Sequence, residues 1–286
     1  MNEQRQQNGG FKAVAIVTAV IGGIALVGSG TTAAFGAVRN ISPSSHSDRV
    51  DAEGITSLNV DVAASNVSIR FGDVDEAELS VAGGSGGWEL ERDGDELTLD
   101  NPNWSWFDDG SMFVGGSWFG DGSWFGDGSW FGGGDQDARV ELVLPESLAG
   151  IDADLWLGAG SLDVEGDFGE LDVTLAAGST RVSGTAESVD VELNAGRADL
   201  ELDVDEASFQ VAAGELIADL TGTAPRDVQV TLSAGSAVVT LPDVEYDVSQ
   251  NVSAGSLDNE LQTASNARNS VTVELTAGSV RLRPAD

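Results

Sequence analysis

The sequence predicts an all-β protein built as a parallel β-solenoid, similar to a β-helix, with about nine short rungs of roughly 18–23 residues. A series of Ala-Gly pairs has Leu or Val three residues before each glycine, and apolar residues alternate with polar ones on either side. A unit of this size cannot bury its apolar face alone, so the copies must stack. The glycines of these pairs are Gly160, Gly178, Gly196, Gly214, Gly235, Gly255 and Gly278.

The apolar alternation changes phase at each glycine. In the copy 171–182, Leu171, Val173 and Leu175 precede Gly178 at odd spacing, whereas later copies resume apolar residues two and four positions after the glycine. A strand cannot change its buried face without an extra residue, so the glycine is expected at a bulge or corner. The lack of a Cβ permits a sharp bend there, and we expect the small preceding alanine to fit inside it.

Two strand arrangements are compatible with this alternation. Equivalent positions of successive copies form columns of like residues, and these matched columns favour parallel stacking in register. The alternative is an antiparallel meander or sandwich with the glycines at hairpin ends. One outward column supports stacking, because it would place Arg181 between Asp163 and Asp199. Exposed ion pairs contribute only about 0–1 kcal/mol, so this column indicates register more than stability.

The N-terminal segment is expected to meet a membrane. Residues 1–12 are polar, contain Arg5 and Lys12, and are predicted to be cytoplasmic, while 13–38 contain no charged residue. This run can span a hydrocarbon core of roughly 30 Å as a transmembrane signal-anchor helix. A cleaved signal peptide ending near Ala37 is the alternative, and either reading exports the remainder. Residues 39–54 are interpreted as a linker.

The repeat domain is assigned to 55–286. Degenerate copies are expected at 58–69, with Ser65 at the glycine position, and at 77–88, and further strands at 90–100 and 139–145. Between these strands lies a Gly/Trp/Phe-rich low-complexity insertion, 101–137, with tandem hexads such as Gly-Ser-Trp-Phe-Gly-Asp at 116–121. Its candidate partner-binding residues are Trp104, Trp106, Phe107, Trp118, Phe119, Trp124, Phe125, Trp130 and Phe131.

Three explanations of this insertion remain open. It is a repeat expansion without function, an adhesive patch that stacks on sugars or partner proteins, or a loop that enters the bilayer interface. Asp121 and Asp127 between the aromatic residues weaken the last explanation on an anionic membrane.

Charge excludes one class of partner. The chain has 13 basic against 48 acidic residues, a formal net charge of −35. Such a surface repels nucleic acid and anionic lipid, and it favours cations and cationic partners. The same acidity also suits a high-salt habitat. The chain has no cysteine, so neither disulfides nor thiolate metal sites are available to it.

Catalytic chemistry has little support in the residue types. His46, in the linker, is the sole histidine, which rules out a histidine zinc site and disfavours a Ser-His-Asp triad. Asp163, Asp199 and Asp258 share a column that would line a groove in a polysaccharide-active β-helix enzyme. The acidic turns 93–96 and 132–137 have oxygen ligands but not the spacing of a calcium loop. We therefore expect no catalytic residues, no metal and no cofactor.

The pattern resembles a known family. The membrane segment, the strand 140–145 ending in Leu-Pro, and the serial Val-x-Leu-x-Ala-Gly-Ser turns resemble the bacterial putative-adhesin family of β-strand repeats, a membrane-anchored domain of unknown function. The resemblance covers about 55–284. It implies a β-solenoid outside the cytoplasmic membrane, with roles in adhesion or envelope-stress sensing, and it supplies no catalytic residues.

These observations predict a non-enzymatic, adhesin-like binding module. It would be held in the cell membrane by a single pass through 13–38, with its C-terminal domain extracytoplasmic, and would bind an envelope glycan or protein but no nucleic acid. The first alternative is an envelope-stress regulatory protein that acts through a membrane partner. The second is an enzyme acting on polysaccharide.

Overall fold

The computed structural model describes residues 45–83, 87–101 and 138–285. The predicted membrane segment 13–38 and almost all of the insertion 101–137 lie outside these residues. The described chain is all-β, with one short 3-10 turn, η3 (Glu146–Leu148). Among the described residues, no helix has the length and apolar character needed to cross a membrane.

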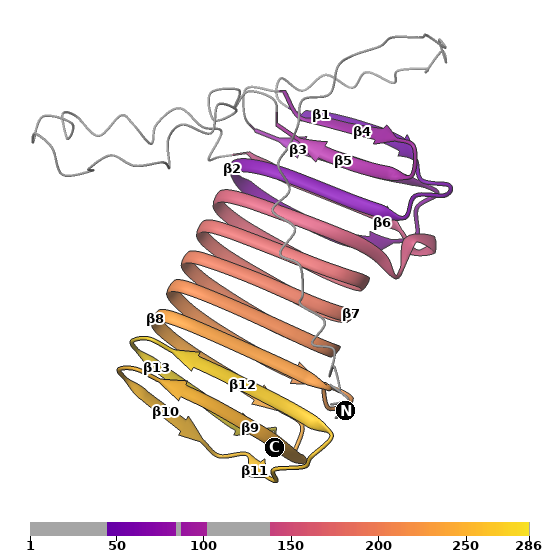
Figure 1. The fold of residues 1–286 in the computed structure, drawn as a ribbon. Coiled ribbons are helices and arrows are strands. Elements are labelled where there is room, and N and C mark those ends of the chain that lie inside the picture. Colours follow the sequence, from indigo (N-terminus) through magenta and orange to yellow (C-terminus); the bar gives the residue numbers. More distant parts are fainter. Residues whose placement is uncertain (1–44, 84–86, 102–137, 286) are drawn as a thin grey trace, which may run out of the picture. The chain divides into compact units, whose positions relative to one another are not determined.

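The strands form one 13-stranded sheet whose central members are parallel. β2 (Ser57–Gly72) pairs with β7 (Ile151–Thr221), β7 pairs with β8 (Asp227–Leu241), and β8 pairs with β12 (Asn269–Leu275). β7 winds through several successive turns, each beside the previous one (Figure 1). Equivalent columns meet in register, as in Phe209 beside Val230 and Val230 beside Val273. The in-register parallel pairing is confirmed, and the antiparallel alternative is wrong for these strands.

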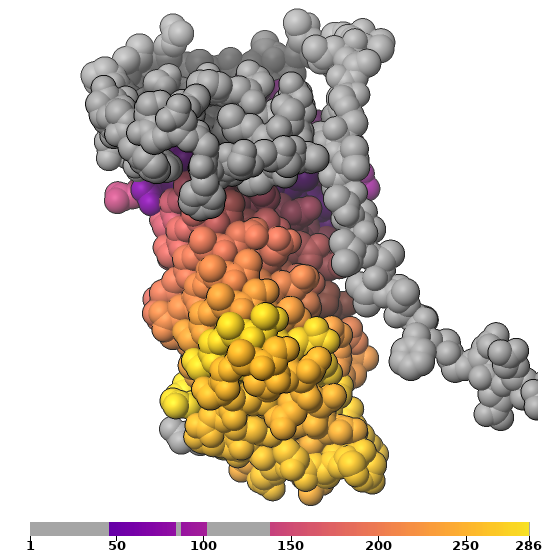
Figure 2. Space-filling model, turned by 60° about the vertical axis from the view of Figure 1, so that its left-hand side comes forward, coloured from indigo at the N-terminus to yellow at the C-terminus, as the bar shows by residue number. Residues whose placement is uncertain are grey.

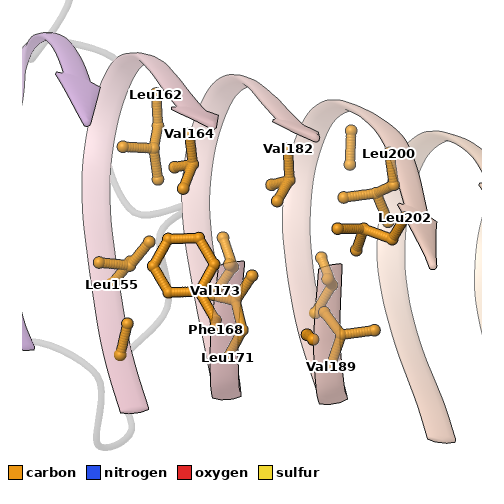
Figure 3. Close-up of a cluster of buried hydrophobic side chains, with 14 of the residues drawn as sticks. Leu155, Leu162, Val164, Phe168, Leu171, Val173, Val182, Val189, Leu200 and Leu202 are labelled. Atoms are coloured by element: carbon orange, nitrogen blue, oxygen red, sulfur yellow. The ribbon is translucent and has the colours of Figure 1, made fainter. Parts of the chain in front are cut away.

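The phase change at the corner is confirmed by burial. Leu171, Val173 and Leu175 before Gly178 are buried, and so are Thr180 and Val182 after it. Side chains from both halves of each turn point into one apolar interior (Figure 3). Fully burying one such aliphatic side chain stabilises the fold by about 1.5–3 kcal/mol, so the stack of turns provides the main stabilising term.

The corner glycines lie directly on one another. Gly178 has a φ of 124°, and a Cβ built on it would overlap the carbonyl oxygen of Gly160 in the preceding turn. The expected corner is therefore present, and the neighbouring backbone is what requires glycine there. The alanine prediction is wrong, because Ala177 is exposed on the outer side of the corner.

Antiparallel strands close the N-terminal end of the stack. β5 (Glu96–Asp100) and β6 (Arg139–Pro145) both pair in parallel with β2 and form the two halves of one turn. β3 (Glu76–Ala82) then runs antiparallel to β6, β1 (Ser45–Asp51) antiparallel to β3, and β4 (Glu89–Asp93) antiparallel to β5.

Two predictions fail at this end. The segment 77–88 is not a stacked copy of the repeat, because its strand, β3, is antiparallel. Residues 45–51 belong to the sheet as β1 and not to a linker covering 39–54. Alternation of apolar residues has the same form in either strand direction, so the sequence did not distinguish the two pairings.

At the C-terminal end the order in space differs from the order in sequence. β12 lies between β8 and β9 (Glu245–Val252), and β13 (Ser279–Pro284) lies between β8 and β10 (Ser256–Asn259). The turn formed by β12 and β13, which is last in sequence, therefore lies in space between β8 and the turn formed by β9 and β10. The orange and yellow segments adjoin at this end (Figure 2). The short strand β11 (Gln262–Thr263) pairs with the start of β9.

Candidate functional site

The predicted aromatic partner-binding residues lie outside the described residues, but the structure fixes where their segment is attached. β5 pairs with 57–61 of β2 and ends at Asp100, while β6 pairs with 66–72 and begins at Arg139. The two points of attachment therefore lie beside Asp61 and Asn66, which flank the corner 62–65 of β2. Both strands that flank the insertion keep their pairing with β2.

The strands before each corner carry an acidic outer surface, which we call the acidic face. No arginine or lysine occupies an outward position of these strands from β2 through the third turn of β7. Asp154, Asp172 and Asp190 occupy the same column in successive turns. The outward carboxylates of the acidic face are Asp61, Asp152, Asp154, Glu170, Asp172, Asp190 and Glu192.

Partial burial, together with repulsion between neighbouring carboxylates, raises pKa values on the acidic face. Partial burial and then the neighbouring charges of Glu170, Asp190, Asp154 and Asp152 raise the pKa of Asp172 to about 6. Burial likewise raises the pKa of Asp190, although hydrogen bonds from Ser208 and Gln210 oppose the shift. A carboxyl group with a raised pKa keeps its proton to a higher pH than an isolated one.

A shallow depression of about 260 Å³ lies on the acidic face, where short side chains of β2 adjoin carboxylates of β7. It is lined by Ser57, Leu58, Asn59, Glu96, Asp152, Ala153, Asp154, Glu170 and Asp172. Its polar groups are carboxylates, one amide and one hydroxyl, so it would accept a cationic group and repel an anionic one.

The strands after each corner carry a different surface, which we call the paired face. Arg197 contacts Asp199 at 2.8 Å and Glu215 at 2.6 Å, the second pair joining neighbouring turns. Arg70 contacts Glu141 at 2.8 Å and thereby joins β2 to β6. The hydrogen bond from Arg197 is the main reason that the pKa of Asp199 is lowered.

The paired face corrects part of the predicted Asp–Arg–Asp column. Arg181 acts on Asp199 through its charge, but the ion pair of Asp199 is with Arg197. The acidic column proposed for a polysaccharide enzyme is also interrupted, since Ile217 and Val238 occupy it between Asp199 and Asp258. Asp258 contacts Arg281 at 3.4 Å. Asp163, Asp199 and Asp258 are therefore not brought together as a catalytic set.

Two other titratable side chains, those of His46 and Tyr246, each have a hydrogen-bond partner. His46 lies in β1 with its Nε2 atom 2.7 Å from Asp48 Oδ2. The buried Tyr246 donates a hydrogen bond to the Pro242 carbonyl at 3.0 Å, and burial followed by the charge of Asp243 raises its pKa to about 12.

The two acidic turns considered for calcium have different outcomes. The turn 93–96 connects β4 to β5, and the Gly94 carbonyl in it accepts a hydrogen bond from Arg92 at 2.8 Å. Within the described residues no group of three or more acidic or histidine side chains has metal-binding geometry. The second turn, 132–137, lies outside the described residues.

Comparison with known proteins identifies similar structures only. No family model matches the chain, and no curated protein matches it significantly. A putative adhesin from Bacteroides fragilis has a TM-score of 0.41 at 12% identity, covering 84% of this chain and 98% of its own. A putative cell adhesion protein from Clostridium sporogenes has a TM-score of 0.33 at 13% identity, covering 85% and 100%. These values transfer no function to this chain.

Proposed function

We propose that this chain is a non-enzymatic, adhesin-like binding module of the cell envelope, in which a parallel β-solenoid displays the insertion 101–137 to a partner. One observation carries the proposal. The insertion leaves at Asp100 and returns at Arg139, while the strands on both sides of it stay paired with β2. A long segment held by a rigid scaffold without disturbing it is the usual arrangement of a functional loop.

The solenoid assignment rests on two further observations. Turns from β2 to β12 pair in parallel and in register, and their corner glycines lie one above another. Inward columns from both halves of each turn form one continuous core. Such a scaffold varies its surface through insertions at the corners while its core columns stay constant.

The proposed partner is an envelope glycan or protein. Trp118, Phe119 and their equivalents in the other hexads supply large rigid apolar groups, which stack on sugar rings and dominate protein interfaces. The insertion begins beside a carboxylate whose pKa is raised, because burial and the charges of Glu89, Glu91 and Asp61 act on Asp100. We therefore expect a neutral or cationic partner.

The proposal also includes export and anchoring by 13–38, with signal cleavage as the alternative. The described domain begins at β1, so only a short connection separates it from the apolar run. Fractionation of cells expressing the full chain, compared with a version lacking 1–38, tests this point. Recovery of the full chain in the soluble cytoplasm would contradict both forms of the proposal.

The decisive experiment replaces the insertion by a corner taken from the same protein. Residues 101–138 are exchanged for the four-residue corner 62–65 of β2, which should preserve the melting temperature while abolishing binding to cell envelopes. A matched control keeps the insertion but changes its tryptophans and phenylalanines to serine, and it should lose binding equally. Unchanged binding by the variant that lacks the insertion would refute the role of the insertion, and unchanged binding by the serine variant would refute the role of its aromatic residues. Recovery of a membrane sensor protein by both variants would favour the envelope-stress regulator.

A further inference from the structure

The two ends of the stack are finished differently. At the N-terminal end, antiparallel strands cover both halves of the outermost parallel turn. At the C-terminal end, β11 covers only Glu245 and Tyr246 of β9. Among the described strands, the rest of β9 pairs with β12 alone, and β10 pairs with β13 alone. Residues 247–259 therefore form an open sheet edge, visible beside β9 and β10 in Figure 1.

Two backbone hydrogen bonds show which backbone groups of β9 face this edge. The Tyr246 carbonyl accepts a bond from Ala264 N at 2.9 Å on the outer side, whereas Ser253 N donates to Leu275 O at 2.8 Å on the β12 side. Backbone groups of alternate residues in a strand point to opposite sides. The N–H and C=O groups of Val248, Gln250 and Val252 consequently face the open edge.

The phase of β10 follows in the same way. Ser256 N donates to Gly278 O at 3.0 Å and Glu260 N donates to Leu282 O at 2.9 Å, both toward β13. The backbone groups of Leu257 therefore face the open edge. The edge thus offers donors and acceptors on both halves of the terminal turn, which is a template for an added strand.

Apolar side chains accompany these backbone groups. Val252 is 40% exposed and Val244 is 39% exposed, and these are the large hydrophobic residues that the described part of the chain leaves exposed. In the neighbouring turn Leu275, the register partner of Val252, is 1% exposed. The apolar residues that are buried in the neighbouring turn are therefore partly exposed to solvent at this terminal turn.

Charge around the edge selects the occupant. Glu245 and Asp247 lie on β9, and Asp258 and Glu260 lie on or beside β10, with Arg281 as the nearby cation. A second copy docking by the same edge would bring these carboxylates against their own equivalents in a chain of net charge −35. A basic segment has the complementary charge.

We propose that the open edge 247–259 binds an extended segment of another protein, in which apolar residues alternate with arginine or lysine, as an added β-strand. Apolar side chains on one face of the added strand would cover Val252 and the end of the core. Basic side chains on its other face would lie beside Asp247. This arrangement is strand addition, in which backbone hydrogen bonds provide affinity and side-chain alternation provides specificity.

The test uses a fluorescent nonapeptide of alternating valine and arginine, with the full chain as the binding protein and anisotropy as the readout. We expect saturable binding that falls at least tenfold in Gln250→Pro, since proline removes a donor facing the edge and leaves the bonds to β12 intact. Gln250→Ala is the matched control and should bind normally, because it removes the same side chain but keeps the backbone N–H that faces the edge. Val252→Lys, a charge placed on the edge, provides a second variant, and circular dichroism confirms that each protein is folded.

Three results would overturn the proposal. The first is absence of binding to the full chain. The second is that folded Gln250→Pro binds the peptide as tightly as the parent chain does, or that a peptide N-methylated at alternate residues binds the parent chain as tightly as the unmodified peptide. Either result would indicate attraction to the acidic surface alone. The third is concentration-dependent dimerisation abolished by Val252→Lys, which would make a second copy the occupant. Removal of the insertion should leave peptide binding unchanged, so this test is independent of the proposed function.

Discussion

The acidic face and the paired face enclose the same core but balance their charges in opposite ways. On the acidic face, Asp154, Asp172 and Asp190 stand in successive turns whose described outward positions carry no arginine or lysine, and the pKa of Asp172 is raised to about 6. On the paired face, Arg197 bridges Asp199 and Glu215, and the pKa of Asp199 is lowered. The core therefore provides the stability, while one face is left with unneutralised charge that is available to a cationic ligand.

The largest effect should come from the corner that joins the two faces. Gly178→Ala would place a methyl group against the Gly160 carbonyl oxygen at a positive φ, so the free energy of unfolding should fall by about 3 kcal/mol or more. Gly94→Ala is the control, since no atom lies within 4 Å of its added Cβ and only strain of about 1 kcal/mol remains. Urea unfolding measures both. Equal losses of unfolding free energy in Gly178→Ala and Gly94→Ala would mean that close contact between stacked corner backbones does not require glycine.

On the acidic face, removing a charge should stabilise the protein. Because the pKa of Asp172 is higher in the folded state, the folded chain holds that proton more tightly, and stability falls as the pH rises from about 4 to about 6. Asp172→Asn should therefore raise the free energy of unfolding at pH 7 by about 1 kcal/mol, allowing for solvent screening. Melting curves of both proteins between pH 4 and 7 measure the effect. A melting temperature of Asp172→Asn below that of the parent chain at pH 7 would contradict it.

On the paired face, the same substitution should have the opposite sign. The pKa of Asp199 is lowered, so its contribution to stability is present above its ordinary pKa of 3.8 and is lost as the pH falls through the lowered value. Asp199→Asn should destabilise the protein at pH 7 by less than about 1 kcal/mol, as is typical of exposed pairs. If Asp199→Asn and Asp172→Asn shift the melting temperature in the same direction, the contrast between the faces is wrong.

Salt should produce the smallest effect. Raising the ionic strength from about 0.1 M to 1 M shortens the screening length from about 10 Å to about 3 Å. Screening should raise the melting temperature of the parent chain, and should raise that of Asp172→Asn by less, because part of the repulsion is already gone. An identical response in the two proteins would show that Asp172 does not experience its acidic neighbours.

Much of the fold was predictable because the columns are defined by burial. Apolar residues recur in other copies at the positions of Leu171, Val173 and Leu175, and the phase change at Gly178 requires a bulge or a corner. The antiparallel pairing of 76–82 and the exchanged order of the last two turns were not predictable. In both places the alternating pattern fits either arrangement equally well, and only Gln250, a polar residue in an apolar column, marks an outermost turn.

The difference in charge between the acidic face and the paired face was visible in the sequence, although the net charge does not reveal it. Arg181, Arg197, Arg281 and Arg283 all follow a corner glycine by one to five residues, whereas the strands before the corners from 57 to 192 carry no outward arginine. Sorting charges by their side of the glycine would have separated the two faces. The pKa shifts required the structure, because they depend on how deeply each carboxylate is buried between its neighbours.

The exchanged order of the C-terminal turns has a consequence for folding during synthesis. A chain delivered from its N-terminus presents residues 245–259 before residues 269–284, yet β12 and β13 separate that earlier turn from β8. Every preceding turn of β7 and β8 can be laid down on a finished neighbour as it emerges. The turn formed by β9 and β10 cannot reach its final place until β12 and β13 have been synthesised, so folding of this end is completed only after residues 269–284 have emerged.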